Sequence, residues 1–97
     1  MISKDDIVID GLPEIQFGSS PLVFKLTFDS RKFRNCHDID VAIVDSSGVG
    51  VRHEVSRWGT KMRVTAHFDP QGSEGLARLF VNSSTGVVEV AKFWFVR

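Results

Sequence analysis

The amino-acid sequence predicts an all-β protein, a β-sandwich of seven or eight short antiparallel strands. Apolar and polar residues alternate at a period of two along most of the chain, which is typical of strands with one buried face. No apolar stripe of helical period extends over a full window. Turn residues recur about every 8–12 positions, as they do in small sandwiches. These three observations favour two packed sheets over any helical fold.

The alternation is clearest in two adjacent segments, residues 59–72 and 75–82. The first segment predicts an inner face of Met62, Val64, Ala66 and Phe68, and the second predicts an inner face of Ala77, Leu79 and Val81. A short loop containing Pro70 and Gly72 joins the two strands. Phe80 is then expected on the opposite, outward face of the second strand.

The N-terminal third predicts three further strands. Residues 7–10 form a short strand, and Gly11-Leu12-Pro13 breaks it before a second strand at residues 14–17, as expected of an edge strand that changes partner. Residues 22–28 place four large apolar side chains on one face, Leu22, Phe24, Leu26 and Phe28. This segment is the expected central strand.

The remaining strands are expected at residues 39–44, 49–55 and 87–96. Asp45-Ser46-Ser47-Gly48 separates the first two, because Asp and Ser bond their own backbone and Gly accepts positive φ. Residues 82–86 form the loop before the last strand. That last strand runs almost to Arg97, so we expect the chain to close the final domain of a longer polypeptide.

Length, composition and charge limit the classes of function. Ninety-seven residues with 42% hydrophobic content predict a single domain spanning residues 1–97. Twelve basic and twelve acidic side chains cancel, so we expect neither nucleic acid nor an anionic membrane surface as a partner. No apolar run approaches the roughly 18 residues of a membrane-spanning helix, so we expect no membrane insertion. The single cysteine, Cys36, excludes an internal disulfide and leaves the compartment open.

The order of these segments resembles a known family. A strand reading Pro-Leu-Val-Phe-Lys-Leu-Thr-Phe, a strand ending Val-Asp-Ser-Ser-Gly, and the segments 59–72 and 75–81 are similar to the early-set immunoglobulin-like domains of filamins, invasins and carbohydrate-associated surface proteins. The resemblance implies an immunoglobulin-like sandwich that acts as a spacer, an adhesion module or a holder of a protein or glycan. The chain departs from many such domains because it has no cysteine pair and no tyrosine corner.

No motif for catalysis or for a cofactor is present, and we predict that the protein is not an enzyme. Cys36-His37-Asp38-Ile39-Asp40 is the best metal-like cluster, but structural zinc sites use four ligands in spaced pairs. We interpret it as a polar loop and expect no metal or cofactor, while binding by Cys36 and His37 stays an open alternative. Gly72-Ser73-Glu74-Gly75 lacks the spacing of a nucleophile elbow.

The tryptophans are the strongest candidates for a binding surface. Trp58 lies beside Arg57 in an expected loop, and a loop tryptophan next to arginine commonly anchors a protein partner or a sugar ring. The alternative is that Trp58 packs into the open end of the sandwich. Trp94 and Lys92 share one face of the last strand, and Phe80 is expected to extend this surface. Either a neighbouring domain or subunit covers it, or Trp94 packs over the long stem of a neighbouring Lys or Arg. We therefore predict a non-catalytic protein-binding or assembly module that binds another protein or a second copy of itself. The alternative is a carbohydrate-binding module that stacks a glycan on an exposed tryptophan.

Overall fold

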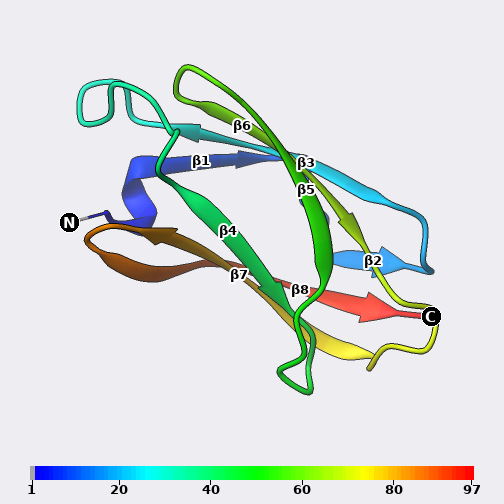
Figure 1. The fold of residues 1–97 in the computed structure, drawn as a ribbon. Coiled ribbons are helices and arrows are strands. Elements are labelled where there is room, and N and C mark those ends of the chain that lie inside the picture. Colours follow the sequence, from blue (N-terminus) through cyan, green and yellow to red (C-terminus); the bar gives the residue numbers. More distant parts are fainter. Residues whose placement is uncertain (1) are drawn as a thin grey trace.

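The computed structural model describes residues 2–97 and arranges them as two packed four-stranded sheets (Figure 1). Sheet A has the order β1-β3-β6-β5, and sheet B has the order β2-β8-β7-β4. The elements are η1 (Lys4–Asp6), β1 (Ile7–Asp10), β2 (Ile15–Phe17), β3 (Leu22–Phe28), β4 (Asp40–Val44), β5 (Arg52–Trp58), β6 (Lys61–His67), β7 (Gly75–Ser83) and β8 (Gly86–Val96). All neighbouring strands are antiparallel except β2 and β8, which are parallel. The predicted all-β sandwich is confirmed.

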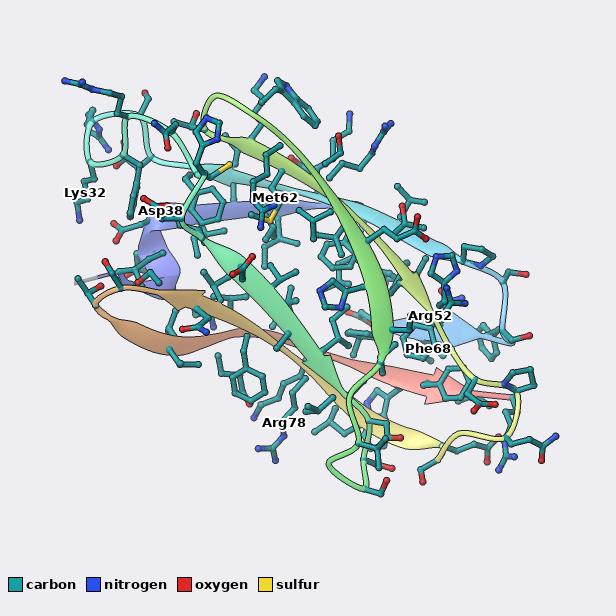
Figure 2. All side chains as sticks on the ribbon, viewed as in Figure 1. Lys32, Asp38, Arg52, Met62, Phe68 and Arg78 are labelled. Carbon is teal, nitrogen blue, oxygen red and sulfur yellow. The ribbon has the colours of Figure 1, made fainter. Side chains whose placement is uncertain are left out.

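The period-two alternation places the core between the sheets. The four apolar residues predicted for the central strand β3 are all buried, as are the inner faces of β6 and β7. Figure 2 shows Met62 and Phe68 between the sheets and Arg78 pointing away from them. Each fully buried Val, Leu, Ile, Phe or Met side chain stabilises the fold by about 1.5–3 kcal/mol.

Aromatic rings join the two sheets at one end of the core. Phe68, just after β6, stacks on Phe95 of β8 with ring centroids 4.7 Å apart. The same ring meets Phe93 edge-on at 5.8 Å. The loop that follows Phe68 therefore crosses from sheet A to sheet B over a fixed aromatic contact.

The fifth strand lies further along the chain than the sequence predicts, at Arg52–Trp58 instead of residues 49–55. The turn after β4 explains the shift. Oδ1 of Asp45 accepts from the backbone nitrogens of Ser47 and Val49, at 2.9 and 3.0 Å, and the nitrogen of Val51 donates to the carbonyl of Ile43. Residues 49–51 thus complete the turn, and Trp58, expected in a loop, is the last residue of a strand.

A short 3-10 helix, η1, precedes β1 and was not expected from the sequence. Its capping residue Ser3 exchanges hydrogen bonds with the helix: the Ser3 nitrogen donates to Asp6 Oδ2 at 2.9 Å, and the Asp5 nitrogen donates to Ser3 Oγ. The buried Asp6 also accepts from Lys32 Nζ at 2.7 Å. These bonds from Lys32 and Ser3 hold the pKa of the Asp6 carboxyl below its ordinary value. Across residues 2–97, no helix has the length and apolar character needed to cross a bilayer.

Candidate functional site

Three large apolar side chains lie beside one another on the outer face of sheet B. Ile15, Phe17 and Trp94 have exposed fractions of 43%, 69% and 52%. Ile15 is the direct partner of Trp94 across the β2–β8 pair, and Phe17 lies two positions further along β2. Because alternate residues of a strand share a face, all three side chains project to the same side. We call these three residues the apolar patch.

Backbone hydrogen bonds fix β2, which is only three residues long, against β8. The Trp94 nitrogen donates to the Glu14 carbonyl at 2.8 Å, and the Gly18 nitrogen donates to the Val96 carbonyl at 2.7 Å. Pro13 lies just before this strand, where its missing N–H removes no sheet bond. Ile15 and Phe17 are surface residues that the sequence did not indicate. Their alternation was visible, but the identity of their neighbouring strand was not.

Lys92 and Phe80 also lie on the outer face of sheet B, but charged groups separate Phe80 from the apolar patch. Lys92 Nζ lies 3.7 Å from Glu89 Oε2, and Arg78 lies 3.6 Å from the same carboxylate. Phe80 is half-buried and is the cross-strand partner of Glu89, beyond this group. The structure therefore places Lys92 at the border of the apolar patch and Phe80 outside it.

Trp58 and Arg57, expected to act together, point to opposite sides of β5. Trp58 lies on the outer face of sheet A and is 45% exposed. The guanidinium of Arg57 turns toward β4, where Nη2 donates to the Ile39 carbonyl at 2.8 Å and to Asp40 Oδ1 at 2.6 Å. The expectation that Trp58 lies in a loop is wrong, because β5 extends to this residue. Neighbouring residues in a strand face opposite ways, so Trp58 and Arg57 do not share one surface. Arg57 instead ties the two edge strands together.

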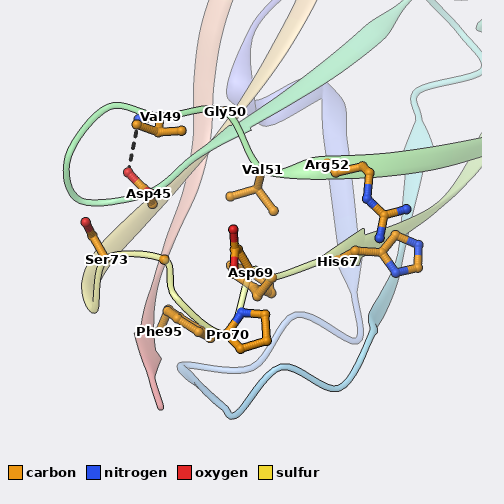
Figure 3. A pocket seen from close by; sticks show the side chains of 12 residues that line it. Asp45, Val49, Gly50, Val51, Arg52, His67, Asp69, Pro70, Ser73 and Phe95 are labelled. Carbon is orange, nitrogen blue, oxygen red and sulfur yellow. Dashed lines mark hydrogen bonds between the residues drawn. The ribbon is translucent and has the colours of Figure 1, made fainter.

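A cavity of about 400 Å³ opens at the end of the sandwich, between the turn after β4 and the loop after β6 (Figure 3). Its wall combines apolar residues such as Val51 and Phe95 with the carboxyl groups of Asp45 and Asp69. The Asp45 carboxyl is already engaged by its own turn. The Ser47 hydroxyl, above all, lowers its pKa, and backbone nitrogens add to the effect. Neither tryptophan lines this cavity.

Cys36 and His37 do not form a joint site. Cys36 is fully buried, its Sγ donates to the Lys61 carbonyl at 3.4 Å, and burial raises the pKa of the thiol. His37 is exposed. Within residues 2–97, no three His, Cys, Asp or Glu side chains come together in a way that would hold a metal ion.

Comparison with solved structures shows the same fold in a filamin domain. The chain superimposes on the crystal structure of the Lin-41 filamin domain with a TM-score of 0.69, covering 93% of this chain and 91% of that chain at 12% sequence identity. No protein-family model matches the sequence, and no curated protein matches it significantly. The structural likeness shows the immunoglobulin-like β-sandwich of the filamin type, and at this identity it shows the fold alone.

Proposed function

We propose that this protein is a non-catalytic binding and assembly module that docks another protein on the apolar patch. The observation that carries the proposal is the side-by-side exposure of Ile15, Phe17 and Trp94 on one rigid sheet face. Exposed apolar groups gathered in one place mark interaction surfaces more often than scattered ones do. Immunoglobulin-like domains of the filamin type often serve protein interactions, which supports the same class of function.

The chemistry of the apolar patch suits a protein partner. Covering it with a partner is favourable by about 25 cal/mol for each Å² of apolar surface removed from water. Tryptophan is among the side chains that contribute most to the binding energy of interfaces. Charged groups lie at its border. Lys92 is on one side, and on another is the Glu74 carboxylate, which accepts from the backbone nitrogen of Arg97 at 2.8 Å and lies 3.9 Å from Nε of the same residue. An apolar centre with a charged rim is the usual anatomy of a protein interface.

A second copy of the chain is the simplest partner, because one apolar patch can pair with itself about a twofold axis. We expect the mass from light scattering during size exclusion to rise from monomer to dimer as concentration increases. Trp94→Ala should abolish the dimer. Trp58→Ala is the matched control, since it removes an equally large exposed ring from the other sheet and should leave the dimer intact.

The folding of the variants must be checked in the same experiment. Trp94 points outward, so Trp94→Ala should keep a cooperative unfolding transition, whereas Phe95→Ala, at a buried neighbour, should lose about 3–5 kcal/mol of stability. A wild-type protein that stays monomeric at every concentration would reject self-assembly through the apolar patch. A dimer that Trp58→Ala dissociates and Trp94→Ala does not would also reject it.

Carbohydrate binding has less support than protein binding. The exposed Trp58 offers a ring for stacking, but sugar sites combine such a ring with a cleft and convergent polar groups. The cavity at the end of the sandwich does not adjoin Trp58.

A further inference from the structure

The outer face of sheet A carries a cluster of three cations, Lys25, Lys61 and Arg63, which we call the cationic face. Lys25 on β3 and Arg63 on β6 are direct cross-strand partners. Lys61 lies two positions before Arg63 on the same side of β6, and its partner on β5 is Trp58. All three cations are exposed. Their charged groups therefore lie on one side of two central strands, next to an exposed indole ring.

None of these three cations forms an ion pair within the part of the chain that the structure describes. Within residues 2–97, no carboxylate lies within ion-pair distance of any of them, and none of their side chains makes a hydrogen bond. The outer face of sheet B is arranged differently, because Arg78 and Lys92 there share the carboxylate of Glu89. The chain is neutral overall, so the cationic face is a local excess of positive charge.

The pairing of Lys25 with Arg63 does not favour folding. Like charges placed directly opposite each other on neighbouring strands are destabilising, and the Lys25–Arg63 pair has this geometry. Neither residue contributes to the core. Folding stability therefore does not explain why the two cations face each other. Binding of an anionic ligand does explain it, because both cations can contact the ligand.

We propose that the cationic face binds an acidic polypeptide segment of a partner protein. The neighbouring residues favour a polypeptide over a uniform polyanion. Asp10 is the partner of Lys25 on β1, and Glu54 is the partner of Thr65 on β5, so carboxylates flank the cations on both sides. A chain of phosphates or sulfates would meet these carboxylates and be repelled. A polypeptide can place carboxylates on Lys25 and Arg63 and other side chains on the flanks.

Exposed apolar groups on the same face fit this ligand as well. Val8 and Val23 have exposed fractions of 60% and 50%, and with Trp58 they surround the three cations. A segment with alternating acidic and apolar residues, extended across the strands, would contact both kinds of group. This surface lies on the other sheet from the apolar patch, so the inference is independent of the proposed function.

The test titrates the protein with a synthetic peptide of alternating glutamate and valine, flanked by serines for solubility. About ten residues suffice, because an extended peptide of that length spans roughly 33 Å. Binding is followed by calorimetry and by amide chemical shifts in low salt and in 0.15 M salt, where the screening length is about 8 Å. The control peptide has glutamine in place of each glutamate.

We expect the acidic peptide to bind and to shift the resonances of Lys25, Lys61, Arg63 and the Trp58 indole, with weaker binding in salt. Arg63→Glu should weaken binding by about tenfold or more, since a repulsive charge pair replaces an attractive one. The same variant should keep or raise the melting temperature, because it removes the repulsion from Lys25. Arg34→Glu, which makes the same charge change in the loop between β3 and β4, should bind as wild type does, and so should Trp94→Ala.

Three results would overturn the inference: no binding of the acidic peptide by the wild-type protein, equal binding of the glutamine peptide, or equal weakening by Arg63→Glu and Arg34→Glu. Tighter binding of a single-stranded oligonucleotide or of heparin, with the same dependence on Arg63, would also overturn it, because the ligand would then be a polyanion and not a polypeptide. Loss of binding in Trp94→Ala alone would move the peptide to the apolar patch and reject the cationic face.

Discussion

The guanidinium of Arg57 donates to the carbonyl oxygen of Ile39 at 2.8 Å and so connects the edge strands of the two sheets. Arg57 lies on β5 of sheet A, and Ile39 immediately precedes β4 of sheet B. At the opposite end of these edges, the Val51 nitrogen donates to the Ile43 carbonyl at 2.7 Å. Arg57 therefore joins the two sheets at the end of these edge strands that lies away from the turn after β4.

Replacing Arg57 by methionine should destabilise the protein by about 1–3 kcal/mol, because the Ile39 carbonyl loses a charged donor while the apolar stem is kept. Urea unfolding at neutral pH measures this change. The matched control is Arg52→Met, which removes an exposed guanidinium from the same strand and should change stability by less than about 0.5 kcal/mol. Equal losses in the two variants would show that the bond to Ile39 does not stabilise the fold.

The contact between Asp6 and Lys32 should make stability depend on acid. Because the folded-state pKa of Asp6 lies below its unfolded value of about 3.9, this contribution is fully present above that value and is lost as pH falls through the folded-state pKa. Unfolding free energies measured from pH 7 down to pH 2 should therefore fall more steeply for wild type than for Asp6→Asn. Asp5→Asn, at the exposed neighbouring position, should keep the wild-type slope.

A glycine is required where the loop after β6 enters β7. Gly75 has φ of +124°, and a Cβ atom there would lie 2.9 Å from Cβ of Ser46, whose hydroxyl donates to the Glu74 carbonyl. Gly75→Ala should lower stability by more than Gly86→Ala, because Gly86 has a similar φ of +139° but open space around it. Thermal unfolding of the two variants separates the clash from the backbone strain. Equal melting temperatures would mean that the turn carrying Ser46 moves aside without cost.

Cys36 should be protected from thiol reagents in the folded protein. Its side chain is fully buried and burial raises the pKa of the thiol, so both access and thiolate content are low. Modification by a chromogenic disulfide at pH 8 should be at least about a hundredfold slower in buffer than in denaturant, since it requires opening of the fold. A native rate near the unfolded rate would place the thiol at the surface.

The inner faces of the strands could be predicted from the sequence because they depend on local alternation. Phe24, Leu26, Val64 and Leu79 are buried as their spacing requires, and the turn residues separate the strands nearly where the structure does. The one displaced strand, β5, moved because Asp45 organises a longer turn than its sequence motif indicated.

The surfaces depend on which strands become neighbours, and alternation carries no information about that. A period of two tells which side of a strand is buried, but not which strand lies beside it. Only the parallel pairing of β2 with β8 puts Ile15 and Phe17 next to Trp94, and only the register of β3 on β6 sets Lys25 opposite Arg63. The sequence alone thus determined the core, through local burial, while long-range strand pairing in the tertiary structure decided both candidate binding surfaces.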